Sequence, residues 1–310
     1  MQDQNKYAGV WPVMLTPFTE SRSIDWDSLE RLIDWYIDAG VHGLFASCQS
    51  SEVFFLSDRE NYELTRFVVE KVDKRVPVVA SGHTATHVSE QLDQIAGISE
   101  TGVDAVILIS NRFAQEGEAS SKALECVQNI TENTPLDLNL GVYECPYPYK
   151  RLMDDAMVSY CATSGRFVFI KDTSCDLGII EKRLRLIEGS RLQLANANAQ
   201  TLLRTYQLGG NAYSGVMANF HPELYVWLHE NWKTNPELAL KVSDFLTLAA
   251  GVESFGYPVN AKAFHRTAGR FDNIACRSRP YANYDESFFP LVVDSMTRLE
   301  KELLNELRKP

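Results

Sequence analysis

The sequence is poor in positive charge. Its 310 residues include 30 lysines and arginines against 41 aspartates and glutamates, a formal net charge of −11. Contacts to nucleic-acid phosphates need a basic face, so we expect no nucleic-acid partner. A negative surface is also repelled by anionic lipids, and no apolar run approaches the roughly 18 residues that a membrane-spanning helix needs. We therefore expect no membrane partner.

Paired cysteines and nucleotide-binding loops are also missing. The six cysteines form no Cys-x-x-Cys pair, and the first residues contain no apolar stretch of the signal-peptide type. A chain of this length buries enough core without disulfides, so we expect reduced thiols and a cytoplasmic protein. Neither Gly-x-x-x-x-Gly-Lys nor Gly-x-Gly-x-x-Gly occurs, which leaves nucleotide binding without support.

One local pattern recurs along the chain, a helix that ends at glycine and is followed by a short apolar run. Glycine suits a helix end because it adopts positive φ without strain. The apolar runs are nearly continuous rather than alternating, which is typical of parallel strands covered on both faces. Eight such strands are predicted, at 8–15, 43–47, 76–81, 105–110, 138–143, 167–171, 192–196 and 212–216.

Amphipathic helical segments separate the strands, and Ser57 with Glu60 predicts a capping box at the start of the second. Eight strand–helix repeats predict the α/β class and a closed (β/α)8 TIM barrel, with an open doubly wound sheet as the alternative. After residue 232 the strands stop, and helices are predicted at 236–250, 258–270 and 286–308. We therefore expect a barrel domain with the active site at 1–232 and a small C-terminal helical domain at 233–310.

A lysine ends the sixth predicted strand. Burying an ammonium is costly, and desolvation lowers the pKa of a lysine toward the neutral amine that a Schiff base with a ketone requires. Tyr143 ends the fifth strand, so it and Lys171 are expected at the same rim of the barrel, where a phenol can pass the protons of imine formation. The alternatives are a lysine that extends to solvent and a tyrosine that packs on a loop.

Two loops hold further candidate ligands. The loop at 48–52, Cys-Gln-Ser-Ser-Glu, offers hydroxyls and backbone N–H groups to a substrate carboxylate, although serines are also common in ordinary turns. His83 and His87 have the spacing of metal ligands on one helix face. Only two such ligands are evident there, so we expect a polar loop and no metal.

Several segments together resemble the dihydrodipicolinate synthase / N-acetylneuraminate lyase family of Schiff-base-forming barrel aldolases. The loop at 48–52 is similar to that family's Gly-Thr-Thr-Gly-Glu loop, residues 143–146 to its Tyr-Asn-x-Pro motif, and residues 169–174 to the segment with its Schiff-base lysine. Weaker similarities lie at 9–18, 208–210, 218–219 and 258–262. The tyrosine–lysine pair is the specific part of the resemblance, which covers nearly the whole chain in order.

The resemblance implies a role for each matching residue. Lys171 would form an imine with the keto carbon of pyruvate or another 2-oxo acid, Tyr143 would relay protons, and Ser50 would bind the carboxylate. Thr173 matches a residue that sialic-acid lyases use near substrate hydroxyls. The expected substrate-binding set is completed by Gln49, Ser51 and Ser214. No external cofactor and no metal are implied, because the protonated imine is itself the electron sink, and a homotetramer is implied as the assembly.

The sequence also departs from the family pattern. An arginine that the synthases carry five residues after the tyrosine is Pro148 here, their relay threonine is Gln49, and their second relay tyrosine has no counterpart at 110–113. Lysine-pathway synthase activity is therefore not expected. The acidic pair that sialic-acid lyases carry after the seventh strand aligns with Ala199 and Gln200, so that substrate is not expected either.

These observations predict a Schiff-base-forming lyase, an aldolase that acts on a small 2-oxo acid and releases or condenses pyruvate. Two alternatives stay open: a sugar-acid dehydratase that uses the same lysine, and a 2-oxo-acid-binding protein without catalysis. An amide can both donate to and accept from hydroxyls, so Gln49 favours a polyhydroxylated 2-oxo acid.

Overall fold

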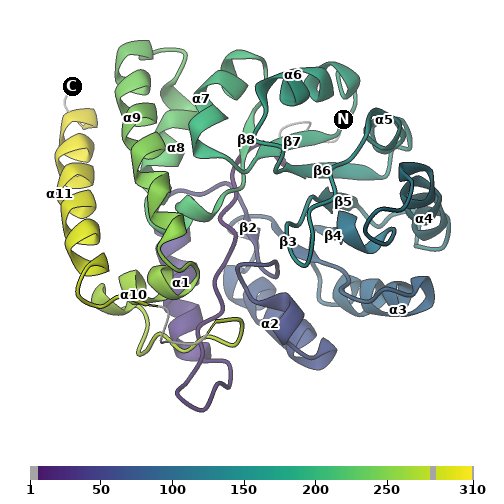
Figure 1. The fold of residues 1–310 in the computed structure, drawn as a ribbon, viewed down its shortest axis with the longest axis horizontal. Coiled ribbons are helices and arrows are strands. Elements are labelled where there is room, and N and C mark those ends of the chain that lie inside the picture. The colour runs from purple at the N-terminus through teal and green to yellow at the C-terminus, as the bar shows by residue number, and fades with distance from the viewer. Residues whose placement is uncertain (1–5, 280–283, 309–310) are drawn as a thin grey trace.

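The computed structural model describes residues 6–279 and 284–308 and contains eight parallel strands surrounded by helices (Figure 1). The strands pair in chain order from β2 to β8, and β8 pairs with β1. A parallel bridge between Val13 and Phe45 closes the ring. The fold is therefore a (β/α)8 TIM barrel, as predicted. Its strands are β1 (Gly9–Val10), β2 (Leu44–Phe45), β3 (Val78–Ser81), β4 (Ala105–Ile109), β5 (Leu140–Tyr143), β6 (Phe167–Asp172), β7 (Gln193–Asn196) and β8 (Ala212–Tyr213).

The strands next to the closure are shorter than predicted. The prediction of 8–15 exceeds β1 by several residues, and the prediction of 212–216 exceeds β8, which gives way to a 3-10 helix at Val216–Asn219. Pro12 has no N–H with which to continue a ladder, although its carbonyl accepts a hydrogen bond from the Phe45 N–H at 3.0 Å. An apolar run in the sequence indicates burial. Here the buried stretch of chain is longer than the stretch that pairs regularly as a strand.

Eight helices alternate with the strands, and side chains cap several of their N-terminal ends. The predicted capping box is confirmed: the Ser57 hydroxyl accepts from the Glu60 N–H at 3.3 Å, and the Glu60 carboxylate accepts from the Ser57 N–H at 2.9 Å. Such caps satisfy N–H groups that have no partner within the helix. The helices are α1 (Trp26–Asp38), α2 (Asp58–Val72), α3 (Val88–Ser99), α4 (Ser120–Glu132), α5 (Asp155–Thr163), α6 (Leu177–Leu186), α7 (Ala199–Gln207) and α8 (Pro222–Asn231).

Large side chains fill the inside of the barrel. Trp11 and Phe169 lie edge to face with ring centroids 5.4 Å apart, and Phe45 lies 6.4 Å from Phe169. Gly141 on β5 makes room for them, since a Cβ there would lie 2.5 Å from Ile107 Cδ1 and 2.8 Å from the Phe169 carbonyl oxygen. The interior is thus a packed core, as is usual for a TIM barrel.

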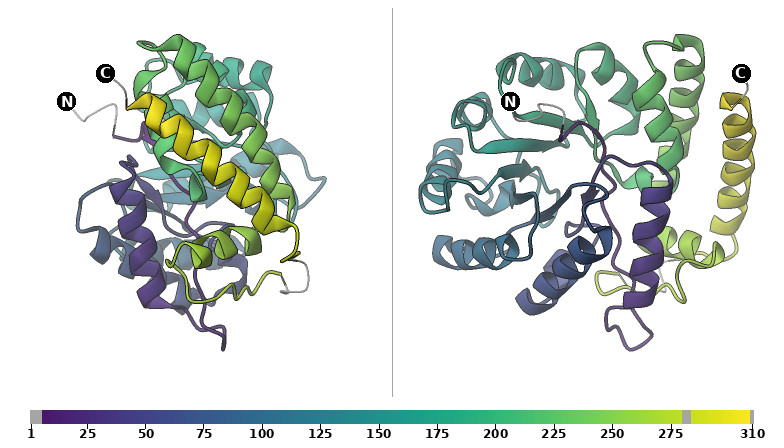
Figure 2. Two further views of the ribbon diagram at one scale, coloured as in Figure 1. Left: turned by 90° about the vertical axis from the view of Figure 1, so that its left-hand side faces the viewer. Right: turned by 180° about the vertical axis from the view of Figure 1, so that it is seen from behind.

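Three helices follow the barrel: α9 (Pro236–Ala249), α10 (Val259–Thr267) and α11 (Phe289–Leu307). In the described part of the chain no strand lies beyond residue 232. Helix α9 packs against α7 and α8, and α11 lies along the outer side of α9 (Figure 2). Of the helices that the structure describes, none combines the length and the apolar character needed to cross a bilayer.

A buried ion pair joins this C-terminal region to the loop after β2. The Lys262 Nζ on α10 lies 2.5 Å from the Glu52 Oε1, and both side chains are fully buried. The Glu52 Oε2 accepts from the backbone N–H groups of Arg277 at 2.7 Å and Ser278 at 2.6 Å. Burial opposes a charge on Glu52, but Lys262 and these donors hold the pKa of the carboxyl below its usual value. The pair therefore fixes residues 277–278 against the rim of the barrel.

Lys262→Met should lower the free energy of unfolding by about 3–5 kcal/mol, because it leaves a buried carboxylate without its counter-charge. Denaturant unfolding measures the change. Lys71→Met is the matched control, since the Lys71 Nζ lies 2.7 Å from the Glu30 Oε1 but these side chains are 39% and 44% exposed. That exposed pair should contribute less than about 1 kcal/mol. Equal losses in the two variants would contradict the role given to Lys262.

Candidate active site

Lys171 and Tyr143 lie side by side at the C-terminal ends of β6 and β5. They are register partners in the sheet, and the Lys171 Nζ lies 4.2 Å from the centroid of the Tyr143 ring. The Phe45 ring on β2 lies 5.8 Å from the same nitrogen. The two residues therefore share one rim of the barrel, the position that their spacing in the sequence predicts.

The amine of Lys171 is enclosed by protein. The residue is only 3% exposed, and none of the ion pairs among the described residues includes it. Burial lowers the pKa of the Lys171 amine, and the negative potential of Cys48, Cys145 and Glu253 opposes this only in part. The environment thus favours the neutral amine, which is the nucleophilic form.

The Tyr143 hydroxyl points to the loop after β2. It donates to the Gln49 Oε1 at 3.5 Å, and the Cys145 thiol donates to the same oxygen at 3.3 Å. Burial raises the pKa of Tyr143 well above its ordinary value, so the phenol keeps its proton at neutral pH. Gln49 occupies the position next to the tyrosine, but an amide oxygen carries no proton that it could pass on.

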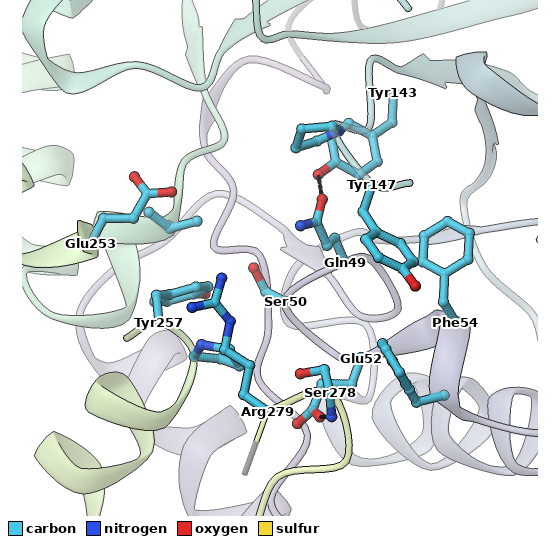
Figure 3. Close-up of a pocket in the computed structure, with 14 residues that line it drawn as sticks. Gln49, Ser50, Glu52, Phe54, Tyr143, Tyr147, Glu253, Tyr257, Ser278 and Arg279 are labelled. Atoms are coloured by element: carbon cyan, nitrogen blue, oxygen red, sulfur yellow. Dashed lines mark hydrogen bonds between the residues drawn. The ribbon is translucent and has the colours of Figure 1, made fainter. Parts of the chain in front are cut away.

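A cavity of about 290 Å³ opens beside this pair (Figure 3). Tyr143, Gln49 and Ser50 line it, whereas Lys171 is not among the lining residues and reaches it only through its neighbour Tyr143. The other lining residues are Glu52, Phe54, Phe55, Pro146, Tyr147, Val216, Glu253, Tyr257, Pro258, Ser278 and Arg279. The cavity is large enough for a small organic acid.

The two serines of the loop after β2 lie differently. Ser50 lines the cavity and is 5% exposed. Ser51 is fully buried, and its hydroxyl lies 2.7 Å from the Met14 carbonyl oxygen and 3.0 Å from that of Ala46 while it accepts from the Cys48 N–H at 3.1 Å. Ser51 thus ties the loop to the barrel, and only Ser50 presents its side chain to the cavity.

Thr173 and Ser214 do not line the cavity either. The Thr173 N–H donates to the Glu144 Oε2 at 2.9 Å, and its hydroxyl donates to the Glu144 carbonyl at 2.8 Å. Ser214 follows β8 and is fully buried, and its hydroxyl has no hydrogen-bond partner among the described residues. The structure therefore brings Lys171, Tyr143, Gln49 and Ser50 together and places Ser51, Thr173 and Ser214 outside that group.

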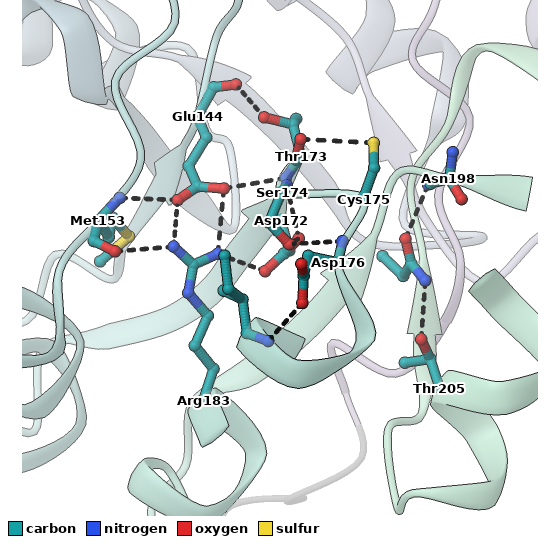
Figure 4. Close-up of polar contacts among 12 residues, drawn as sticks. Glu144, Met153, Asp172, Thr173, Ser174, Cys175, Asp176, Arg183, Asn198 and Thr205 are labelled. Atoms are coloured by element: carbon teal, nitrogen blue, oxygen red, sulfur yellow. Dashed lines mark hydrogen bonds and ion pairs between the residues drawn. The ribbon is translucent and has the colours of Figure 1, made fainter. Parts of the chain in front are cut away.

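A buried charge cluster lies behind the site, and the sequence analysis missed it (Figure 4). The residues that directly follow Tyr143 and Lys171 are Glu144 and Asp172. Arg183 on α6 contacts both, with its Nη2 2.6 Å from the Glu144 Oε1 and its Nη1 paired with Asp172. Burial raises the pKa of Glu144, which Arg183 opposes. An acidic residue after each of the two strand ends is the signal that could have revealed this cluster.

The C-terminal region supplies one wall of the cavity, which the sequence analysis also missed. Glu253, Tyr257, Ser278 and Arg279 reach it from segments far from the strands in sequence (Figure 3). Partial desolvation raises the pKa of Glu253, and the Lys171 charge opposes this. No local pattern marks these residues, because long-range contacts bring their segments to the rim, among them the Glu52–Lys262 and Arg277–Glu60 ion pairs.

The two histidines considered as metal ligands differ in their environments. His83 is buried, and its Nε2 accepts from the Ile109 N–H at 3.2 Å. Burial lowers the pKa of His83 to about 3, helped by the charge of Arg112. His87 is exposed at the start of α3. Within residues 6–279 and 284–308, no group of three or more His, Cys, Asp or Glu side chains is placed to hold a metal ion.

Comparison with known sequences gives a consistent result. A model of the dihydrodipicolinate synthetase family matches residues 6–292. The 4-hydroxy-tetrahydrodipicolinate synthase of Staphylococcus carnosus is 30% identical over 276 residues, which are 87% of this chain and 90% of that protein. The protein of the same name from Teredinibacter turnerae is 30% identical over 227 residues, 70% of this chain and 72% of that protein.

Solved structures share the fold. A monomeric dihydrodipicolinate synthase variant matches with a TM-score of 0.86 at 19% identity, covering 98% of this chain and 100% of that one. YagE, a prophage protein of the dihydrodipicolinic acid synthase family from E. coli K12 solved with pyruvate, matches with a TM-score of 0.82 at 21% identity, covering 96% and 98%.

We expect Lys171 to react as a nucleophile at lower pH than an ordinary lysine, because burial lowers its pKa from the usual 10.5. Cyanate carbamylates only the neutral amine, so the labelling rate at Lys171 should rise with pH and level off once the pH exceeds the lowered pKa. Mass spectrometry of the digest measures the rate, and the exposed Lys74 corrects for the reagent's own pH dependence. A midpoint at or above 10.5 would contradict the expectation.

Proposed function

The chain belongs to the dihydrodipicolinate synthetase family and is a lyase of the class I aldolase type; we propose that Lys171 forms a Schiff base with the keto carbon of a small 2-oxo acid. In this proposal the enzyme releases pyruvate or condenses it with an aldehyde. The observation that carries it is the contact of the desolvated Lys171 amine with the Tyr143 ring beside the cavity.

The proposed reaction begins with the neutral amine. Lys171 attacks the keto carbon, the carbonyl oxygen takes up a proton, and the resulting carbinolamine loses that oxygen as water to give an iminium ion. In the cleavage direction the C3–C4 bond of a 4-hydroxy-2-oxo acid then breaks. Its electron pair moves into the iminium to form an enamine. The C4 hydroxyl gives up its proton, and the fragment that carries C4 leaves as an aldehyde. Protonation of the enamine at C3 and hydrolysis release pyruvate and restore Lys171.

Tyr143 and Ser50 are the residues that we propose for proton transfer and carboxylate binding. Tyr143 keeps its proton at neutral pH and lies against the amine, which suits a group that gives and recovers protons at the substrate oxygens. Ser50 lines the cavity one residue from Gln49, whose amide we propose binds a substrate hydroxyl. The chemistry needs neither an external cofactor nor a metal, because the iminium is itself the electron sink.

Dehydration of a sugar acid with the same lysine is the second candidate, and Glu253 is the observation that favours it. In that reaction a proton leaves C3, and the C4 hydroxyl departs as water after it receives a proton. Glu253 lines the cavity, so its carboxyl is placed to supply that proton. Pyruvate formation from a panel of 4-hydroxy-2-oxo acids supports the aldolase, whereas loss of water without pyruvate supports the dehydratase.

We also propose a homo-oligomer, with the tetramer of the family resemblance as the expected form. A monomeric variant is present among the structural neighbours, so family membership by itself does not fix the number of subunits. Sedimentation equilibrium of the purified chain measures it.

Borohydride reduction in the presence of pyruvate should label Lys171. The reduced imine is stable, so digestion and mass spectrometry identify the modified lysine. Lys171→Arg keeps a positive charge but cannot form the imine, and it should abolish the label. Lys150→Arg, on the loop that follows β5, should leave the label in place. A label on another lysine, or no label with a range of 2-oxo acids, rejects the proposed function, and labelling without turnover indicates a binding protein.

Tyr143→Phe should slow the trapping of pyruvate by about 10²–10⁴-fold, the usual effect of removing a positioned proton-transfer group. The pyruvate concentration that gives half the maximal rate should change little, because the ring that packs on Lys171 remains. Tyr160→Phe, on α5 and outside the cavity, is the control. An unchanged trapping rate in Tyr143→Phe would show that Tyr143 only packs against the lysine.

A further inference from the structure

A further phenol lines the cavity from the C-terminal side. Tyr257 lies just before α10, across the cavity from the Tyr143–Gln49 contact, and Ser50 lies between them in Figure 3. The sequence offers no reason to connect Tyr257 with the strand ends, because it follows the barrel by more than one helix. The fold nevertheless adds a tyrosine hydroxyl from the C-terminal region to those of Tyr143 and Tyr147, which also line the cavity.

The hydrogen bonds of Asn219 determine the direction of the Tyr257 proton. The Asn219 Nδ2 lies 3.0 Å from the Val13 carbonyl, 3.0 Å from the Val216 carbonyl and 3.0 Å from the Tyr257 hydroxyl. Carbonyl oxygens only accept, so the amide nitrogen must face this way and the amide oxygen must face the other. The Tyr36 hydroxyl donates to that oxygen, in agreement with this orientation.

The two hydrogens of the Asn219 amide are shared among these three acceptors, and the amide nitrogen itself accepts no hydrogen bond. The Tyr257 O–H therefore cannot donate to Asn219 and is available to donate in another direction. Ser50 is its neighbour on the cavity side, and the interaction with Ser50 partly offsets the rise that burial causes in the pKa of Tyr257. The phenol thus holds a proton at neutral pH and has a hydroxyl next to it inside the cavity.

Tyr143 can exchange a proton with the substrate, but its hydrogen-bond partner among the described residues is not a hydroxyl that could relay a further proton to it. Its hydroxyl faces the Gln49 Oε1, which also accepts from the Cys145 thiol. An amide has separate donor and acceptor atoms and does not exchange a proton through one atom as a hydroxyl does. Ser50 and Tyr257, in contrast, are both hydroxyls that can donate and accept.

We propose that Tyr257 is a catalytic residue of this site, which works with Ser50 to supply protons to the substrate oxygen during imine formation. The proposal rests on the Schiff-base chemistry of Lys171. It gives the C-terminal region a chemical role in addition to its structural role in lining one side of the cavity.

The proposed step is the loss of water from the carbinolamine. The C–O bond breaks, and the oxygen leaves as water with a proton from Ser50, which in turn receives the Tyr257 proton. The nitrogen lone pair forms the C=N bond, so the product is the iminium ion. The tyrosinate that results recovers its proton from water or from the acid released later, when the imine is hydrolysed.

The test compares three variants with the wild type in single-turnover trapping of pyruvate by borohydride. Tyr257→Phe keeps the ring and removes the hydroxyl, and it should slow trapping by about 10²–10⁴-fold. Ser50→Ala should slow it in the same step when pyruvate is saturating, a condition under which the separate role of Ser50 in carboxylate binding does not limit the rate. If the two hydroxyls act in one chain, the double variant should be no more than a few-fold slower than the slower single variant. Rates that multiply in the double variant would overturn the shared chain.

Tyr36→Phe separates a structural role from a chemical one. Tyr36 is fully buried in the same hydrogen-bonded chain but does not line the cavity. The Tyr36→Phe variant should have a lower melting temperature than the wild type, and its trapping rate should stay within a few-fold of the wild-type rate. If Tyr257→Phe behaves as Tyr36→Phe does, Tyr257 only supports the fold and the proposal is wrong.

The wild-type result distinguishes this proposal from the proposed function. If wild-type Lys171 is not labelled by pyruvate and borohydride, the Schiff-base function itself fails. If the wild type and Tyr257→Phe are labelled at the same rate, the function stands and only the role of Tyr257 is overturned.

Discussion

The carboxylate of Glu52 is the constraint on which the candidate site depends. It accepts from the Lys262 ammonium and from the backbone of residues 277–278, all within the protein interior. A buried carboxylate is costly unless it is paired and hydrogen-bonded, so the loop after β2 and the C-terminal segment have to fold against each other. That requirement brings Tyr257, Ser278 and Arg279 to the cavity and completes its wall.

A second buried charge cluster holds the two strand ends from behind. Successive residues of a strand point to opposite faces, so Glu144 and Asp172 lie behind the sheet where Tyr143 and Lys171 lie in front. Arg183 contacts both carboxylates, and Thr173 and Met153 donate backbone N–H groups to Glu144. The positions of the phenol and the amine are therefore coupled through groups that never meet the cavity.

In the proposed mechanism, the other hydroxyls of the site account for Gln49, which stands where the family resemblance implies a threonine. The Gln49 amide oxygen accepts a hydrogen bond from the Tyr143 hydroxyl but has no proton to pass on. Ser50 and Tyr257 provide a separate pair of hydroxyls on the other side of the cavity. Ser51 and Thr173 also carry hydroxyls near the same strands, but these hydroxyls donate to backbone carbonyls.

The sequence by itself determined the barrel and the lysine–tyrosine pair. Nearly continuous apolar runs, separated by capped helices, are compatible with few folds other than parallel strands covered on both faces, and the register of β5 with β6 then places Tyr143 beside Lys171. Which hydroxyls face the cavity could not be predicted, because rotamers and loop hydrogen bonds decide it, as Ser50 and Ser51 show. Only the tertiary structure brought in Tyr257, since long-range contacts place it at the cavity, among them its hydrogen bond with Asn219 and the Glu52–Lys262 ion pair, and the local sequences of these residues carry no sign of each other.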